Sequence, residues 1–310
     1  MSVMRSVLLA VSENRWMRET GPKLWFVKRA ARRFMPGEEF ADMLRAADEL
    51  APSGILTVFT RLGESVTDAG EATAVREHYL DALTQLESRG MRSEPSIKLT
   101  QLGLDIDMEQ CFTNLRALAE RAHATGNYLW VDIEQSGYVD VTLELTRRVK
   151  AEFPRVGICL QAYLYRTMDD LKAMIDHGIG VRLVKGAYKE PASVAFPKKA
   201  DVDEHFFKLA VVMLEGLARK NGFRPVFGTH DLSLVARIQA HAKRAGLAAS
   251  DVEVHMLYGI QRAAQGRLVK EGVNLRVLVA YGSYWFAWYV RRLAERPANV
   301  WFVVRSMFAR

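Results

Sequence analysis

The chain contains little cysteine and no long hydrophobic run. Its two cysteines, Cys111 and Cys159, lie in apolar-periodic surroundings. This excludes a disulfide-bonded scaffold and favours a reducing compartment. No window approaches the roughly 18 apolar residues that a membrane-spanning helix needs. The N-terminal residues show no signal-peptide pattern. We therefore expect a cytoplasmic protein.

Sequence motifs for metals and nucleotides are also missing. The seven histidines show no HxH, HExxH or paired CxxC spacing, so we predict no metal site. His230 and His255, at the ends of predicted strands, leave a two-histidine site open as an alternative. There is no serine nucleophile elbow and no Walker A sequence. The only GxG, at Gly178 and Gly180, precedes a predicted strand, which is the wrong place for a dinucleotide fold.

Positive charge is in excess, with a formal net charge of +7. A positive net charge of this size is compatible with binding to nucleic acid, a membrane surface or a polyphosphate. The lysines and arginines are spread along the chain, which argues against nucleic acid. The densest cluster, on a predicted N-terminal helix, is typical of a solvated face, and contact with anionic lipid stays open. This cluster consists of Lys28, Arg29, Arg32 and Arg33.

Hydrophobic periodicity predicts a (β/α)8 barrel of the TIM type that follows an N-terminal helical arm. An apolar stripe from Phe40 to Leu50, ended by Pro52, predicts a helix within an arm over residues 1–52. Downstream, over residues 53–310, eight short apolar runs are each followed by an amphipathic stretch, which fits a barrel better than a doubly wound sheet. The predicted strands are 55–59, 96–99, 128–133, 156–161, 180–184, 225–228, 252–255 and 276–279. The predicted helices are 70–89, 109–125, 137–151, 167–177, 203–220, 232–245, 259–271 and 283–295.

In such a barrel the chemistry belongs where the strands end and the following loops begin. Polar and ionisable residues gather at nearly every one of these places. They include Arg61, Glu64, Lys98, Gln101, Asp132, Glu134, Gln161, Tyr163, Lys185, Tyr188, Thr229, His230, Asp231, Tyr258 and Tyr281.

The segment RLVKGAYKE combines cations with small residues. Arg182 and Lys185 stand beside Gly186 and Ala187, which permit close approach to the backbone. Fixed cations next to bare N–H groups suit a phosphate or an electron-rich ring. Lys198 and Lys199, in the loop before the next predicted helix, could add charge for a pyrophosphate. The alternative is that Arg182 and Lys185 pair with carboxylates around the barrel.

The segment YGSYWFAWYVRRLAERPAN follows the last predicted strand. Its adjacent arginines, Arg291 and Arg292, come directly after a dense aromatic patch. This combination suits a small carboxylate held beneath aromatic walls. The alternative is that Arg291 and Glu295 form an exposed i, i+4 pair worth a few tenths of a kcal/mol.

Several of these motifs together closely resemble the flavin-dependent proline dehydrogenases, in order through about residues 50–300. They are SIKLTQLGLDID around Lys98, VDIE with Asp132, LQAY with Gln161, RLVKGAY, GTHD, HMLYGIQ and RRLAERPAN. The resemblance implies a distorted (β/α)8 barrel with FAD bound non-covalently at the C-terminal ends of the strands. It also implies oxidation of L-proline to Δ1-pyrroline-5-carboxylate by hydride transfer to the flavin N5, with electrons passed to a membrane quinone.

The resemblance also assigns roles to individual residues. It implies that Lys98, Arg291 and Arg292 hold the substrate carboxylate and that Asp132 lies near substrate and flavin. Glu64 is expected to pair with Arg291 as a gate. Leu257, Leu278, Trp288 and Glu295 are expected to belong to the substrate pocket. The residues implied around FAD are Gln161, Arg182, Lys185, Gly186, Ala187, Tyr188, Lys199, Thr229 and His230.

Three positions depart from the family pattern. Leu278 and Trp288 stand where relatives carry tyrosine, and Ala280 stands where they carry proline. The lost hydroxyls put the choice of substrate in doubt, and hydroxyproline or another cyclic secondary amine is an alternative. A further alternative is a non-redox barrel enzyme that uses Arg182 and Lys185 to bind a phosphorylated carboxylate. A peripheral membrane contact through the basic helix or through 301–308 is weighed against a packed terminal helix.

Overall fold

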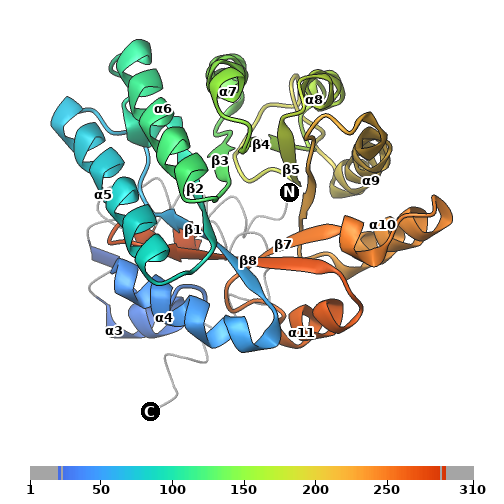
Figure 1. The fold of residues 1–310 in the computed structure, drawn as a ribbon, viewed down its shortest axis with the longest axis horizontal. Coiled ribbons are helices and arrows are strands. Elements are labelled where there is room, and N and C mark those ends of the chain that lie inside the picture. Colours follow the sequence, from blue (N-terminus) through green and yellow to red (C-terminus); the bar gives the residue numbers. More distant parts are fainter. Residues whose placement is uncertain (1–19, 22–23, 287, 291–310) are drawn as a thin grey trace.

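A computed structural model describes residues 20–21, 24–286 and 288–290 of the chain. Eight parallel strands pair in sequence order, and β1 also pairs with β8, so that the sheet closes on itself (Figure 1). The predicted (β/α)8 architecture is confirmed. The strands are β1 (Leu56–Arg61), β2 (Ser93–Lys98), β3 (Leu129–Asp132), β4 (Val156–Gln161), β5 (Gly180–Val184), β6 (Pro225–Gly228), β7 (Glu253–Leu257) and β8 (Asn274–Tyr281).

Amphipathic helices surround the strands (Figure 1). Two of them begin at aspartates predisposed to cap: Asp68 accepts from the Glu71 backbone N–H at 2.9 Å, and Asp107 accepts from that of Gln110 at 2.8 Å. The helices are α3 (Trp25–Ala31), α4 (Phe40–Leu50), α5 (Ala69–Ser88), α6 (Met108–Ala124), α7 (Val139–Glu152), α8 (Thr167–Asp176), α9 (Lys199–Gly216), α10 (Leu232–Arg244) and α11 (Arg262–Lys270). Short 3-10 turns lie at 51–53, 99–102, 136–138, 217–219 and 249–251. Within the described part of the chain, no helix is both long and apolar enough to cross a membrane.

Most predicted boundaries agree with the structure, and β4, β5 and β6 coincide with their predictions. The strand predicted at 96–99 instead begins at Ser93, because polar residues of β2 point into the barrel and break the expected apolar run. The helix predicted at 203–220 begins at Lys199 and ends at Gly216. Of the helix predicted at 283–295, residues 285, 286 and 288–290 are helical, and those after 290 lie outside the described residues.

Helix α4 covers the seam where the barrel closes. It packs on β1 and β8, and in Figure 1 it lies between α3 and α11. The Phe40 ring lies 5.6 Å from the rings of Phe59 on β1 and Tyr281 on β8. Part of the predicted N-terminal arm thus contributes to the barrel wall. A domain boundary at residue 52 stays a prediction.

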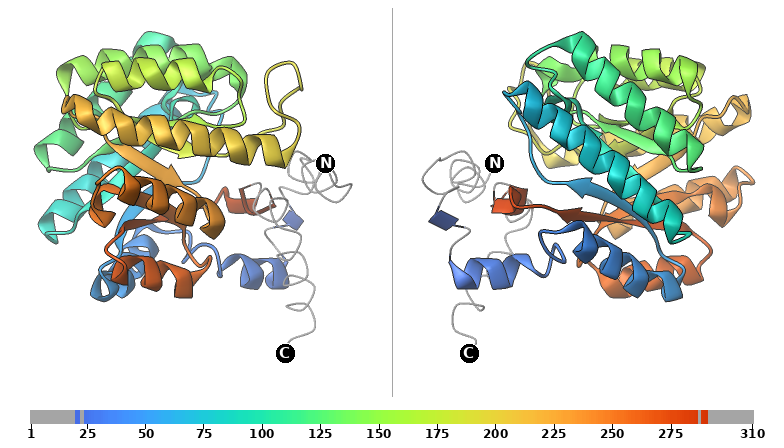
Figure 2. Two further views of the ribbon diagram at one scale, coloured as in Figure 1. Left: turned by 90° about the vertical axis from the view of Figure 1, so that its right-hand side faces the viewer. Right: turned by 60° about the vertical axis from the view of Figure 1, so that its left-hand side comes forward.

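Helix α3 lies where β8 ends. Val27 and Ala31 of α3 share an apolar cluster with Trp285 and Trp288. Figure 2 shows α3 beyond α4, close to the end of β8. The segments before β1 and after β8 therefore meet near the C-terminal ends of the strands.

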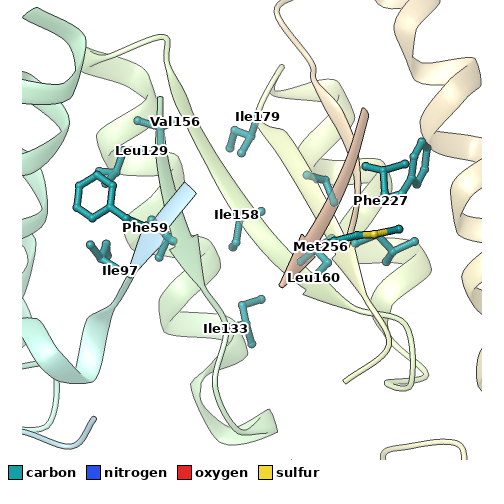
Figure 3. Packing of buried hydrophobic residues seen from close by; sticks show 14 of the residues in the cluster. Phe59, Ile97, Leu129, Ile133, Val156, Ile158, Leu160, Ile179, Phe227 and Met256 are labelled. Carbon is teal, nitrogen blue, oxygen red and sulfur yellow. The ribbon is translucent and has the colours of Figure 1, made fainter. Parts of the chain in front are cut away.

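Alternate strand residues face the helices or the barrel interior, as the period of two requires. The outward residues form the main core, and Figure 3 shows part of it around Ile97, Ile133 and Ile158. Inside the barrel, an apolar cluster from β1, β6 and the region of β3 occupies the middle. Its residues are Val58, Tyr128, Trp130 and Val226. Charged residues lie toward both ends of the interior, and the set at the C-terminal ends forms the candidate site.

Candidate active site

An ion pair between β3 and β5, on either side of β4, forms the centre of the site. Arg182 on β5 is 4 % exposed and forms a salt bridge with Asp132 at the end of β3. Ser96 on β2 joins them, because its Oγ accepts from Arg182 Nη2 at 2.7 Å and donates to Asp132 Oδ1 at 3.1 Å. Burial disfavours the charge on Arg182, but Asp132 and Cys159 together outweigh it, and the pKa of Arg182 is raised.

Two buried polar atoms at this centre have no partner among the described residues. Gln161 Nε2 donates to the carbonyls of Ile133 at 3.1 Å and Glu134 at 3.0 Å, which fixes the amide, while its Oε1 is unsatisfied. Arg182 Nη1 is likewise buried and unsatisfied. Leaving such a group unpaired costs about 1–3 kcal/mol, so a polar ligand beside β4 and β5 would be stabilising.

The lysines of the predicted cofactor site face carboxylates. Lys185 Nζ donates to Asp203 at 2.5 Å and to Asp231 at 2.8 Å. Lys199 forms ion pairs with the same two aspartates. Burial opposes ionisation of Asp231, but the charge and hydrogen bond of Lys185, together with hydrogen bonds from Ser233 and the Leu234 N–H, outweigh it and lower the pKa of Asp231. The alternative that Arg182 and Lys185 pair with neighbouring carboxylates is therefore seen in the structure.

The turn after β5 brings bare backbone close to an aromatic ring. Gly186 has φ +113°, and a Cβ there would lie 2.2 Å from the Tyr163 ring, so glycine alone fits. Ala187 and Tyr188 follow it and are half-buried. The missing side chain lets the Tyr163 ring pack directly against the backbone of this turn at the predicted cofactor site.

The loop after β6 is tied to β7 and the turn that follows it. The Thr229 hydroxyl accepts from the Asp231 N–H at 3.1 Å. His230 Nε2 accepts from the Leu257 N–H at 3.2 Å, and its carbonyl accepts from Gln261 at 2.8 Å. Thr229 and His230 therefore position this loop, and their predicted contact with FAD stays a prediction.

A cavity of about 310 Å³ lies beside the loop after β1. It is lined by Lys98 and Trp288 of the predicted substrate site, by Glu64 of the predicted gate, and also by Gln101 and Tyr284. Lys98 Nζ donates to the Gly63 carbonyl at 3.3 Å, in the loop that carries Glu64. The volume is at the small end of the range for ligand pockets, which suits a substrate of amino-acid size.

Leu278 extends the apolar surface from the barrel interior toward the strand ends. It lies opposite Val58 of β1 and Leu257 of β7 in the sheet. It packs against the interior cluster and against the cluster that contains Ala280 and Trp288. Asp132, Leu257 and Leu278 are not among the described residues that line this cavity. The cavity therefore contains only part of the predicted substrate site.

A buried carboxyl group organises the loops after β1 and β2. Glu134 is 3 % exposed and accepts from the Thr100 hydroxyl at 2.9 Å. Thr100 Oγ1 and its carbonyl accept in turn from the N–H groups of Ser65 and Val66, at 3.0 and 3.1 Å. Burial raises the pKa of Glu134 to about 7, although Lys98 opposes this. The loop that carries Glu64 is thus fastened through Thr100 to Glu134.

The predicted carboxylate anchor lies mostly outside the described residues. Arg291, Arg292 and Glu295 fall there, as does the segment 301–308. The anchor around Lys98 and the gate between Glu64 and Arg291 therefore stay predictions.

Three residues with clear positions in the site were not identified from the sequence. Ser96 precedes Lys98 by two residues, so the period of the strand places both on the inner face. Asp203 lies one helical turn after Lys199. Thr100 carries no sequence signal, since its role depends on how two loops meet.

Comparison with known proteins agrees with this fold and these motifs. The family model described as Proline dehydrogenase matches residues 43–305. Proline dehydrogenase 1 of Bacillus subtilis (strain 168) is 36% identical over 305 residues, which are 98% of this chain and 99% of that protein. Proline dehydrogenase of Deinococcus radiodurans is 34% identical over 309 residues, covering 98% and 97%.

Solved structures of larger proteins share the fold. Proline utilization A from Bdellovibrio bacteriovorus, inactivated by N-propargylglycine, superimposes with a TM-score of 0.80 at 23% identity. The match covers 87% of this chain and 33% of that one, so our chain spans about a third of its length. Proline utilization A from Bradyrhizobium japonicum gives a TM-score of 0.73 at 24% identity, over 90% and 32% of the two chains. From the family match and the nearly full-length relatives, we conclude that this chain belongs to the proline dehydrogenase family.

Proposed function

We propose that this chain oxidises L-proline to Δ1-pyrroline-5-carboxylate with FAD as the hydride acceptor and a quinone as the final electron acceptor. Family membership supports the reaction. The observation that carries the proposal is the buried centre of Asp132, Ser96 and Arg182, where Arg182 Nη1 and Gln161 Oε1 have no partner among the described residues. Such a pair is suited to a polar ring system bound beside β4 and β5.

The described residues are better suited to bind the flavin ring of FAD than its phosphates. Arg182 and Gln161 offer one unsatisfied donor and one unsatisfied acceptor. Lys185 and Lys199 are balanced by Asp203 and Asp231, so a diphosphate would have to compete with two carboxylates. When bound, FAD would supply the two-electron acceptor that the oxidation needs.

The protein's own part in the reaction is to bind and orient the substrate. Lys98, in the cavity with Glu64, would bind the substrate carboxylate together with Arg291 and Arg292. Charge-assisted bonds from several cations fix one orientation of the substrate ring. Asp132 and Ser96 hold the Arg182 guanidinium in place and keep it charged where negative charge develops. The reactive substrate is the neutral imino acid, so no protein base is assigned.

Absorbance spectroscopy of the purified protein tests the proposal. The protein should be yellow or take up added FAD, and its visible flavin absorbance should bleach on anaerobic addition of L-proline. A quinone should restore the absorbance. Colourless protein that binds no added FAD would contradict both the cofactor and the reaction.

Hydroxyproline or another cyclic secondary amine is a second candidate substrate. The specific observation is the wall around Leu278, which packs on Val58 and other apolar residues in place of a tyrosine hydroxyl. An apolar wall discriminates between analogues only weakly, by about 1–3 kcal/mol. A non-redox enzyme for a phosphorylated carboxylate is less well supported, because Arg182 and Lys185 are already paired. The absorbance experiment separates that class from the first two.

Electron delivery to a quinone calls for peripheral contact between a cytoplasmic protein and a membrane. The basic helix α3 and the segment 301–308 are the proposed contacts. Co-sedimentation with anionic vesicles tests this. The full chain should sediment with them, and a chain truncated after residue 299 should sediment less. Equal sedimentation of the two would exclude the C-terminal segment, and failure of both would exclude the contact.

A further inference from the structure

The N-terminal end of the barrel, opposite the candidate active site, contains a cavity of about 410 Å³ lined by arginines. Arg92, Arg155, Arg224 and Arg276 come from the starts of β2, β4 and β6 and from β8. Glu94 is the acidic residue among the residues that line it. The proposed oxidation uses none of these residues.

The two inner arginines are paired with two buried carboxylates. Arg224 donates to Glu94 at 2.9 Å and to Glu253 at 2.6 Å. Arg276 lies 3.1 Å from Glu94 and donates to Glu253 at 3.0 Å. These four side chains form a compact network in which the formal charges balance.

This network argues against a metal ion. Ligand atoms of Glu94, Glu253 and His255 lie within 4.8 Å of one another. However, both carboxylates already bind guanidinium groups, and a divalent cation would bring further positive charge against Arg224 and Arg276. The local balance therefore favours an anion.

Three of the four guanidinium groups have N–H donors that the network does not use. Arg92 is exposed, and within the described residues its side chain makes no hydrogen bond or ion pair. Arg155 is also exposed and donates to the Gly126 carbonyl. Arg276 Nη1 is buried and has no partner among the described residues. With Glu94 and Glu253 counted against the four arginines, two positive charges are uncompensated around the cavity.

We propose that this cavity is a binding site for a multivalent oxyanion of the phosphate class. Guanidinium groups bind phosphate oxygens in a bidentate manner, and a multivalent anion would match the two uncompensated charges. It would also supply the acceptor that Arg276 Nη1 lacks. The volume accommodates a group larger than a single phosphate, so pyrophosphate is the appropriate probe.

Isothermal titration calorimetry with pyrophosphate tests the site. The protein is first saturated with FAD, so that pyrophosphate does not enter the cofactor site at the other end. Wild type should bind one equivalent. Arg92→Glu combined with Arg155→Glu should weaken binding by about tenfold or more, since two charged donors are replaced by repulsive groups. Both positions are exposed, so the fold should persist, and thermal unfolding checks this.

A matched control separates this site from general charge effects. Arg147 and Arg244 are exposed on α7 and α10, and reversing both charges changes the net charge by the same amount. This control should bind pyrophosphate like wild type. The proposal is overturned by the absence of saturable binding to wild type, by unchanged binding in the double variant, or by equal weakening in the control. If FAD does not bind, the comparison of the two double variants still locates the pyrophosphate.

Discussion

At the residue scale, Leu278 is the position that most directly tests substrate choice. Leu278→Tyr should raise the ratio of kcat/KM for L-proline over 4-hydroxyproline by about tenfold, because a tyrosine hydroxyl bonded within the protein would crowd the ring hydroxyl, which an apolar wall rejects only weakly. Leu278→Phe is the matched control, since it adds the ring without the hydroxyl. Steady-state kinetics with both substrates measure the ratio. An unchanged ratio in the tyrosine variant would show that Leu278 does not set specificity.

Glu134 gives a prediction about pH. Its pKa is raised from 4.5 to about 7 in the folded protein, so the folded state binds its proton more tightly than the unfolded state. The resulting stability is complete below about pH 4.5 and is lost as the pH rises through 7. In the wild type, the free energy of unfolding should fall by an amount on the order of 1–3 kcal/mol between pH 5 and 8. Glu134→Gln should abolish this fall.

Urea unfolding across this pH range measures the effect. Glu144→Gln, at an exposed position on α7, should keep the slope of wild type. Equal slopes for wild type and Glu134→Gln would mean that Glu134 titrates normally.

The residues of the site were only partly predictable from the sequence. Arg182, Lys185 and Gln161 stand out because strand periodicity and barrel topology place them at strand ends. Their partners depend on side chains from other strands, and nothing in a linear pattern shows that Ser96 lies between Arg182 and Asp132. The buried state of Glu134 likewise arises only when two loops pack together.

At the element scale, the loops after β1 and β2 act together through Thr100. Thr100→Val keeps the shape but removes the hydroxyl that binds Ser65 N–H and Glu134. We expect KM for proline to rise by about three- to tenfold with a smaller change in kcat, because the loop beside the cavity loses its attachment. Thr113→Val, on the exposed face of α6, is the control. A change in kcat alone would contradict a positioning role.

Helix α4 gives a prediction about stability. Phe40 is 7 % exposed and packs over the seam between β1 and β8. Phe40→Ala should lower the free energy of unfolding by about 3–5 kcal/mol. Arg45→Ala, on the exposed side of the same helix, should change it by less than about 0.5 kcal/mol. Chemical denaturation compares the two variants. A small effect of Phe40→Ala would mean that packing of α4 on the seam contributes little to the free energy of unfolding.

The apolar stripe of α4 predicted a helix but not its place. A stripe shows that one face is buried, and it does not show against which strands. A strand is easier to predict from the sequence where both of its faces are apolar, as in β4. β2 is harder to predict, because Ser93, Glu94 and Ser96 are buried polar residues.

At the scale of the whole molecule, Trp130 in the barrel interior contacts the charged residues at both ends of the barrel. Its indole N–H donates to Glu94 at 2.7 Å, and its ring lies 5.4 Å from Arg182 and 5.3 Å from Arg224. The count of eight strand–helix units predicted the barrel, but it gave no sign of a charged network at the N-terminal end. That network depends on residues that meet only when the barrel closes.

Arg224→Met tests the importance of this network. The change leaves Glu94 and Glu253 with Arg276 as their one arginine partner among the described residues, and an uncompensated buried charge typically costs about 3–5 kcal/mol. Arg219→Met, at an exposed ion pair with Asp176, should cost less than about 1 kcal/mol. Urea denaturation gives both values. Similar effects for the two variants would show that the network is replaceable.

The pairing of β1 with β8 has a consequence for how the chain folds during synthesis. β1 is made before the other strands of the barrel, yet one of its two hydrogen-bonding edges finds its partner only when β8 has been made. Until then the sheet has two open edges, which are templates for pairing with other chains. Closure over such a long sequence separation is also slow. The nascent barrel is therefore most exposed to aggregation just before its last strand is made.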